Sequence, residues 1–526
     1  MLKQNLNNRD PGMGSPADER KNMNNQFDEL TKSLAQSVTR RGALKKFGLG
    51  LAGMALAGLL AMPASATTLG PLIELSRPNA VGTCDDSFVS LPGNWTLDDA
   101  FEPFVAANPV NPKNIVAVWI QGLLQNIIAA VSFDGGRTWQ QVPIPFTVCS
   151  GGPFLGAGDE RLCFAPNGDL YAIAVIGNDL AFRGIAVCKS TDGGLHWSAP
   201  VVLQDPNTGF VPTDIAVLAA DPTDARRVYA VWDGEDNGHR GPAVFTRTTD
   251  GGRTWEPPRA IVTPKPQDYV QFSQLLVLPN GTLVDVYELV DVKDSGHGIE
   301  QHFSLQVMRS ADHGQTWSSP MNAAAMTPLY GGPIGNALVA DPETGQLVWD
   351  VLNPSIAVDS GNGNIYAVWE DGRFSNFQYN DIAFSMSTDG GFHWSTPIRV
   401  NQTPLGVPPS NRQCFLPTLA ALAGGTIAVT YYDFRFNDPG PGLPTDYWLV
   451  RCQPSSTKPA TNPANWGNEA RLTDSSFNIE DCGTILDQFY PGDYFGLATV
   501  GSDFVSAFTH VDRDNVTSIF FRRVGK

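Results

Sequence analysis

The side chains that could form a reaction centre occur in short segments spread along the chain. Acids stand beside arginines in Asp159-Glu160-Arg161, Asp371-Gly372-Arg373 and Asp433-Phe434-Arg435, and Arg412 and Gly492-Asp493-Tyr494 add further polar groups. An arginine guanidinium is a planar fork that binds both oxygens of a carboxylate, and carboxyl groups can exchange protons. If the fold gathers these segments, they form a functional site. Taken singly, each Asp-x-Arg pair could instead be an ion pair that holds its own loop.

The elements that position these segments are indicated by five copies of one motif, Ser/Thr-x-Asp-x-Gly-x-x-Trp. In such a motif the Asp carboxylate accepts local backbone N–H groups in a tight turn, Gly supplies a positive φ, and Trp packs beneath the hairpin. We therefore predict a structural role for these aspartates and no catalytic one. They are Asp134, Asp192, Asp250, Asp312 and Asp389.

The motif aspartates are separated by 58, 58, 62 and 77 residues, which suits a four-stranded propeller blade with one long loop. Short apolar runs between Gly, Asn and Asp predict antiparallel strands, and helix is nearly absent. Within the fifth unit, strands are expected at 355–358, 365–369, 382–386 and 397–400. Seven apolar runs predict the second strands of seven blades, at 115–119, 170–175, 228–232, 283–287, 365–369, 426–431 and 504–509.

The predicted fold is thus an all-β, single β-propeller with seven blades, six being the alternative. The sixth unit keeps a degenerate motif at 465–472, and the seventh ends one strand short. The segment from Leu72 to Ser76 has strand-like alternation and no other unit to join. We expect it to pair with residues 518–523 and close the ring, which removes an exposed sheet edge.

In a propeller, loops that precede the first strand and follow the second open on one face, opposite the motif turns. Acids, arginines and tyrosines collect on that face in the sequence pattern, and binding loops commonly sit on rigid scaffolds. The segments named above belong to it, together with Glu102, Asp214, Asp233 with Arg240, Asp268, Asp350, Tyr490 and Asp512-Arg513.

The five motifs resemble the Asp boxes of the sialidase superfamily (BNR repeats), over roughly residues 100–525. The segments at 368–374, 429–435 and 492–498 are similar to bacterial exported proteins of the sialidase family. This resemblance implies a sialidase-like glycoside hydrolase acting on an acidic sugar. It implies a carboxylate clamp of Arg161, Arg373, Arg412 and Arg435, a nucleophile at Tyr494 or Tyr490, and an acid at Asp159 or Asp493.

Two features depart from the family pattern. The Arg-Ile-Pro motif is absent before the first box, and sialidases have six blades where we count seven. A non-catalytic propeller that binds glycans or proteins at the cell surface is therefore the alternative. Tyr494 could also be an ordinary β-forming residue packed between blades.

The N-terminal region predicts export to the periplasm or the medium. Arg40-Arg41 precede an apolar stretch from Phe47 to Met62 that ends in Ala64-Ser65-Ala66, as in a twin-arginine signal peptide. We expect a signal region with a disordered leader at 1–66 and the propeller at 67–526, without a transmembrane segment after cleavage. Residues 1–66 carry nine basic and five acidic side chains, so their removal takes the net charge from −18 to −22. Such an acidic monomer argues against a nucleic-acid partner.

The seven cysteines show no metal-binding spacing, and we expect neither a metal nor another cofactor. An oxidising destination favours disulfides, although an odd number leaves one thiol unpaired in a monomer. Cys149 and Cys163 bracket a Gly-rich insertion, so a bridge between them is predicted.

Overall fold

The computed structural model describes residues 67–78, 80–81, 93–122, 125–178, 184–206, 211–236, 239–294, 299–330, 338–511 and 514–525. The predicted signal region, Cys84 and Asp512-Arg513 lie outside these residues. In the part that is described, no helix is long and apolar enough to cross a membrane.

The fold is an all-β propeller of seven antiparallel blades, as predicted. Blade 1 contains β3 (Ala100–Ala107), β4 (Ile115–Gln121), β5 (Asn126–Ser132) and β6 (Gln140–Pro143). Blade 2 contains β7 (Gly156–Phe164), β8 (Leu170–Gly177), β9 (Gly184–Ser190) and β10 (Val201–Gln204). Blade 3 contains β11 (Val211–Ala220), β12 (Val228–Asp236), β13 (His239–Thr248) and β14 (Arg259–Val262).

The next three blades repeat this order. Blade 4 contains β15 (Tyr269–Val277), β16 (Leu283–Asp294), β17 (Ile299–Ser310) and β18 (Met321–Met326). Blade 5 contains β21 (Ser355–Val358), β22 (Ile365–Asp371), β23 (Asp381–Ser387) and β24 (Ile398–Arg399). Blade 6 contains β25 (Cys414–Ala421), β26 (Ile427–Asp433), β27 (Pro444–Cys452) and β28 (Trp466–Arg471), with β29 (Phe477–Asn478) also pairing with β27.

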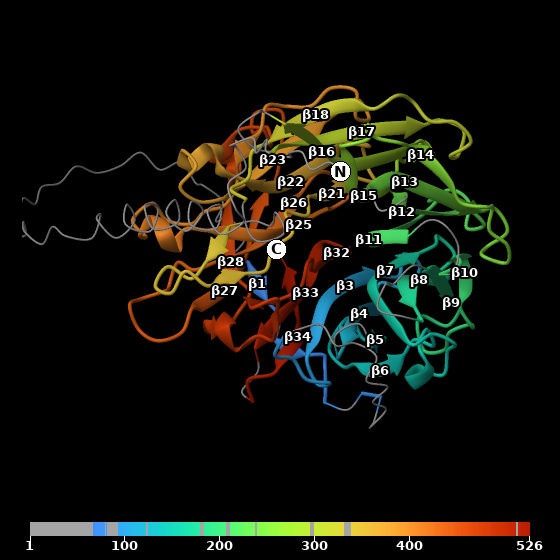
Figure 1. Ribbon diagram of the computed structural model, residues 1–526, viewed down its shortest axis with the longest axis horizontal. Coiled ribbons are helices and arrows are strands. Elements are labelled where there is room, and N and C mark those ends of the chain that lie inside the picture. The colour runs from blue at the N-terminus through green and yellow to red at the C-terminus, as the bar shows by residue number, and fades with distance from the viewer. Residues whose placement is uncertain are drawn as a thin grey trace, which may run out of the picture. The chain divides into compact units, whose positions relative to one another are not determined.

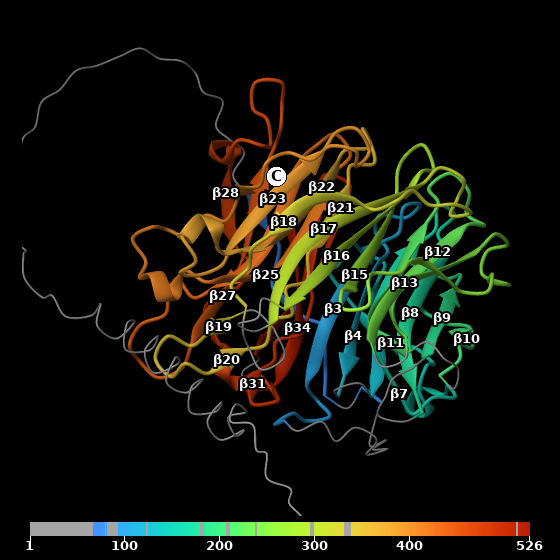
Figure 2. The same cartoon turned by 45° about the horizontal axis from the view of Figure 1, so that its top comes forward.

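Blade 7 joins the two ends of the described chain. Its strands β32 (Gly496–Val500), β33 (Asp503–Val511) and β34 (Thr517–Gly525) are completed by β1 (Thr68–Leu69) and β2 (Ile73–Glu74). In β2, Ile73 pairs with Phe521 and Glu74 with Phe520, so the predicted closure is confirmed. The first strands of successive blades contact one another, and β32 contacts β3, which completes the ring (Figures 1 and 2).

The box turns connect each blade to the one before it. A Cβ at Gly314 would lie 2.4 Å from Cζ of Phe245 in blade 3, at a φ of +85°, so glycine is required there. In all five boxes, the carbonyl that follows the box aspartate accepts a hydrogen bond from the preceding blade. The donors are Arg523, Asn114, Lys189, Arg247 and Arg309 for blades 1, 2, 3, 4 and 5 respectively.

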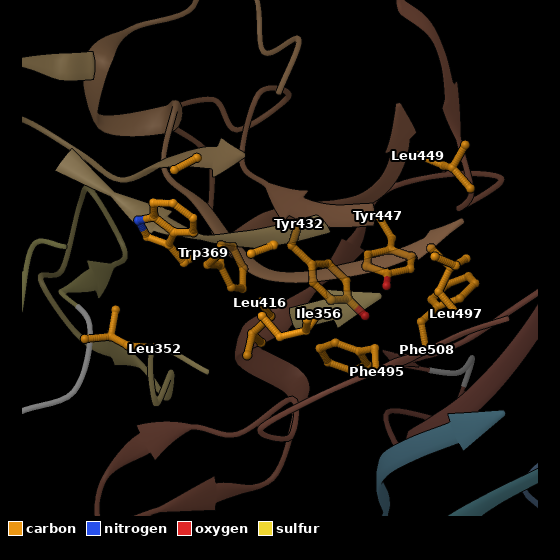
Figure 3. Close-up of a cluster of buried hydrophobic side chains, with 14 of the residues drawn as sticks. Leu352, Ile356, Trp369, Leu416, Tyr432, Tyr447, Leu449, Phe495, Leu497 and Phe508 are labelled. Carbon is orange, nitrogen blue, oxygen red and sulfur yellow. The ribbon is translucent and has the colours of Figure 1, made fainter. Parts of the chain in front are cut away.

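Large buried aromatic side chains fill the spaces between blades. Tyr432 and Tyr447 of blade 6 lie with ring centroids 4.4 Å apart, and Tyr432 lies 5.1 Å from Phe495 at the start of blade 7 (Figure 3). The Tyr432 hydroxyl donates to the carbonyl of Thr509 at 2.6 Å. Each such side chain contributes on the order of 2 kcal/mol by burial, so neighbouring blades stabilise one another.

A small additional sheet was not predicted. It combines β19 (Val339–Ala340) and β20 (Leu347–Val348), inserted between blades 4 and 5, with β30 (Thr484–Ile485) and β31 (Gln488–Phe489), inserted between blades 6 and 7. These short strands carry neither an Asp box nor a long alternating run, so no sequence pattern predicted them.

The predicted bridge between Cys149 and Cys163 is wrong. Cys163 is a free thiol, whereas Cys149 is disulfide-bonded. Cys163 lies on β7, and its Sγ accepts the backbone N–H of Ala220 in blade 3 at 3.1 Å. Its side chain is therefore used in packing blade 2 against blade 3.

Candidate active site at the mouth of the central cavity

The first strands of the seven blades enclose a cavity of about 400 Å³. Apolar side chains such as Leu162 and Val217 line much of it. Polar side chains of its lining lie on the first strands or on the segments just before them. The polar lining residues include Arg161, Gln274, Asn353, Asp493 and Tyr494.

Backbone irregularities recur at or just before the first strands. Non-glycine residues with positive φ stand there in five blades, and the strand register shifts beside four of them. Such bulges redirect side chains, and each strained residue costs on the order of 1 kcal/mol. Acids occupy this position in blades 1 and 2. The five residues are Glu102, Asp159, Phe272, Leu352 and Leu416.

Two buried glutamates come from these irregular segments. Glu102 is 2% exposed and Glu160 is fully buried. Within the described residues, neither carboxyl oxygen of Glu160 has a hydrogen-bond partner. Burial, reinforced by the charge of Glu102, raises the pKa of Glu160 well above its usual range. The environment of Glu160 therefore favours its protonated form, in which it can act as a proton donor.

Two tyrosines surround the same acids. The hydroxyl of Tyr490 donates a hydrogen bond to Glu102, and the guanidinium of Arg161 lies 3.3 Å from the ring centroid of Tyr494. Burial raises the pKa of both tyrosines well above the usual range, and the charge of Glu102 adds to this. Both rings are therefore neutral phenols in the resting protein. For Tyr494, the charge of Arg161 opposes the increase, so Arg161 favours its ionised form.

The structure brings together four of the predicted site residues. Asp493 and Tyr494 precede β32, whereas Asp159 and Arg161 lie on β7. Asp493 is half-buried and accepts a hydrogen bond from Nε1 of Trp349 at 2.6 Å. Asp159 is also half-buried, and its charge acts on Tyr494. Blades 1, 2 and 7 thus form one cluster of carboxyl, phenol and guanidinium groups.

The other three predicted arginines do not line the cavity, and they bind groups of their own loops and of neighbouring blades; Arg373, for example, also donates to the carbonyl of Ala325 in blade 4. Arg373 pairs with Asp371 through Nε and Nη2, both at 2.7 Å. Arg412 donates from Nε to the carbonyl of Val407 at 2.6 Å. Arg435 binds Asp433 and Glu469 and stacks on Trp448 at 3.6 Å. These contacts match the loop-holding interpretation of the Asp-x-Arg pairs.

The box aspartates lie on the turns between third and fourth strands. The carboxylate of Asp250 accepts the backbone N–H of Arg253 and Thr254 and the hydroxyls of Thr248 and Thr254. The hydrogen bonds from Thr254 lower the pKa of Asp250 to about 2. Equivalent side-chain and backbone contacts surround Asp134, Asp192, Asp312 and Asp389. In the structure these carboxylates hold their turns together.

Sequence reasoning missed Trp349, which follows β20 in the inserted sheet. The one available signal was the 77-residue spacing between the fourth and fifth boxes, which exceeds the others and marks an insertion.

Among the residues that the structure describes, no group of three or more His, Cys, Asp or Glu side chains is placed to hold a metal ion.

Comparisons with known proteins agree with a sialidase-like propeller fold. No protein-family model matches the chain. A curated sialidase of Bacteroides fragilis (strain YCH46) is 30% identical over 134 residues, which are 24% of this chain and 24% of that protein. The match therefore spans about a quarter of the curated relative.

Similar solved structures include a protein of unknown function from Dyadobacter fermentans, at 14% identity and a TM-score of 0.44, covering 88% of this chain and 99% of that one. A GH93 α-L-arabinofuranosidase of Fusarium graminearum, solved with arabinobiose, is 13% identical with a TM-score of 0.43, covering 83% and 95%. A Hadza microbial sialidase is 14% identical with a TM-score of 0.39, covering 81% and 66%. Similarity at this level does not bear on the reaction.

Proposed function

We propose that this protein is a glycoside hydrolase whose active site is the mouth of the central cavity between blades 1, 2 and 7. The observation that supports this most is the convergence there of Asp159, Glu160, Arg161, Asp493 and Tyr494. Glycoside hydrolysis needs carboxyl groups in different protonation states beside one sugar ring. The buried Glu160 and the indole-bound Asp493 provide such different environments.

The groups divide into roles as follows. Tyr494 lines the cavity and is the nucleophile, because Arg161 against its ring stabilises the phenolate as it forms. Asp159 gives a proton to the leaving oxygen when the Tyr494 oxygen bonds to the anomeric carbon and the glycosidic bond breaks. It then takes a proton from the water that releases the sugar. Asp493 remains a carboxylate and stabilises the positively charged transition state. Glu102, whose charge acts on Tyr494, takes the phenol proton and returns it when the Tyr494 oxygen leaves the anomeric carbon.

The proposed substrate is a glycan, with an acidic sugar favoured by Arg161 in the cavity wall. Its guanidinium is also held by the Glu160 carbonyl at 3.0 Å, so it is fixed where a sugar carboxylate can approach. Arg373, Arg412 and Arg435 remain predicted substrate ligands from the sequence. To bind a sugar carboxylate, these three arginines would have to give up the hydrogen bonds that they now make within the protein.

The experiment is a panel of chromogenic sialosides, uronides and neutral glycosides, tested with the chain from residue 67 onward. We expect release of the chromophore from an acidic glycoside, and a loss of at least about 100-fold in kcat for Tyr494→Phe and Asp159→Asn. Tyr171→Phe is the matched control, since Tyr171 is another buried tyrosine whose hydroxyl has no hydrogen-bond partner among the described residues. Folded wild-type protein that cleaves none of the panel would contradict the proposal.

A non-catalytic glycan-binding propeller is the second candidate. It is favoured by the hydrogen bonds and ion pairs that three of the four predicted arginines already make to other groups of the protein. Binding of panel glycans with no turnover in either wild type or variants is the result that this alternative predicts.

We also propose that the protein is exported. The support is the paired arginines, apolar stretch and Ala64-Ser65-Ala66 sequence at the N-terminus. Protein recovered outside the cytoplasm should begin at Thr67, and Arg40→Lys with Arg41→Lys should retain it inside. Unchanged export of that double variant would count against a twin-arginine route.

A further inference from the structure

We propose that the inserted sheet is part of the active site and that Trp349 is a positioning residue, which holds Asp493 as an oriented carboxylate. This inference rests on the proposed function and adds to it a residue outside all seven blades. Its basis is that two insertions, distant in the sequence, meet beside the cavity mouth and direct one indole N–H to a cavity-lining acid.

The inserted sheet is anchored on several sides. Within it, Val348 of β20 pairs in parallel with Phe489 of β31, and the backbone N–H of Trp349 donates to the Phe489 carbonyl at 2.8 Å. The side chain of Gln413, just before blade 6, both accepts from and donates to the backbone of Ala340, at 3.1 and 2.9 Å. The backbone position of Trp349 is therefore fixed.

The Trp349 side chain spans from this sheet to blade 7. Its Nε1 donates to Oδ1 of Asp493 at 2.6 Å, and its ring meets that of Tyr490 edge-on, with centroids 5.9 Å apart. Tyr490 in turn donates to Glu102 in blade 1. An N–H donor on a carboxylate favours its charged form. The contact thus fixes the orientation of the Asp493 carboxylate.

The next residue attaches the same segment to blades 5 and 6. Asp350 is fully buried beside Glu370, and its Oδ1 accepts the backbone N–H of Leu352 at 3.0 Å. Glu370 accepts the backbone N–H of Leu416 at 2.9 Å. Burial raises the pKa of both carboxyls, and the charge of Asp350 adds to the increase for Glu370. The segment at 349–350 is held on both sides, as a positioning element requires.

The test compares Trp349→Phe with Trp369→Phe. Each substitution removes an indole N–H bound to a carboxylate and keeps an aromatic ring, since Nε1 of Trp369 donates to Asp371 at 2.8 Å in blade 5. We expect the acidic limb of the kcat/KM profile to move to higher pH by about one unit in Trp349→Phe, because losing a charge-assisted hydrogen bond favours the protonated carboxyl. Trp369→Phe should leave that limb in place. An unshifted limb in Trp349→Phe overturns the inference.

A second measurement does not require activity. In 1H–15N spectra of the 15N-tryptophan-labelled protein, the Trp349 indole resonance is the one lost in Trp349→Phe. It should titrate with pH in the wild type and lose that step in Asp493→Asn. An indole resonance that does not titrate overturns the inference even in an active enzyme. A titrating resonance in a protein that cleaves no glycoside supports the contact with Asp493 and instead contradicts the hydrolase proposal.

Discussion

The stability of the propeller should depend on pH through Glu288, a glutamate that lies outside the proposed site. Glu288 is on β16 of blade 4 and is fully buried. Its Oε2 accepts a hydrogen bond from Gln271 at 3.2 Å, and Oε1 has no partner among the described residues. Burial, with a smaller effect of the Asp233 charge, raises the pKa of Glu288 from 4.5 to about 8. The folded protein therefore binds this proton more tightly than the unfolded chain does.

The sign and size of the effect follow from proton linkage. Because the folded pKa is raised, the stabilisation is fully present below pH 4.5 and is lost as the pH rises through 8. At about 1.36 kcal/mol per pH unit, the loss reaches about 5 kcal/mol. Glu288→Gln keeps the shape and cannot ionise, so this part of the pH dependence disappears. The variant should gain stability relative to wild type between pH 5 and 9.

The assay is urea unfolding at pH 5, 7 and 9, followed by tryptophan fluorescence. Glu300→Gln on the neighbouring strand β17 is the control, because Glu300 is exposed. We expect its difference from wild type to be the same at each pH. If the difference between Glu288→Gln and wild type were equally constant, burial of an ionisable Glu288 would be refuted.

Three further predictions concern the scaffold. Leu75→Ala should lower the free energy of unfolding by about 2–5 kcal/mol in urea titration, because the Leu75 side chain is 2% exposed within blade 7. An unchanged free energy of unfolding would argue against closure of the ring by the N-terminal segment. Arg309→Met should lower the melting temperature by removing the donor to the Gly390 carbonyl in the next box, whereas Arg226→Met, at an exposed turn, should not. Under denaturing, non-reducing conditions, mass spectrometry should find Cys163 alkylated as a free thiol and Cys149 in a disulfide; a peptide linking the two would contradict the structure.

Most of the fold was predictable because the propeller repeats its signals. Each blade carries a buried second strand such as Ile365–Asp371, and five carry an Asp box, so unit number and strand order follow from periodicity. The closing strand was predictable for a different reason. The last unit lacks one strand, and the alternating segment from Leu72 to Ser76 belongs to no other unit, so this segment was expected to supply the missing strand. The pairing of Glu74 with Phe520 confirms that it does.

The site was only partly predictable, because spacing along the chain does not specify side-chain direction. Asp159, Arg161, Asp493 and Tyr494 do cluster, since all four belong to first strands or to the loops before them. Arg435 has an equally suggestive sequence, yet Glu469 on the outer strand binds its guanidinium. Trp349 approaches Asp493 only because two non-repeating insertions form a sheet together.

The central claim is that a sugar binds at the cavity mouth between blades 1, 2 and 7. Its most direct test is a crystal structure of Asp159→Asn soaked with the best glycoside of the panel. We predict density for a sugar ring within hydrogen-bond distance of Arg161 and Asp493, with the anomeric carbon facing the hydroxyl of Tyr494. Density on the Asp-box face, or a saturated soak that leaves the cavity mouth without sugar, would contradict the account.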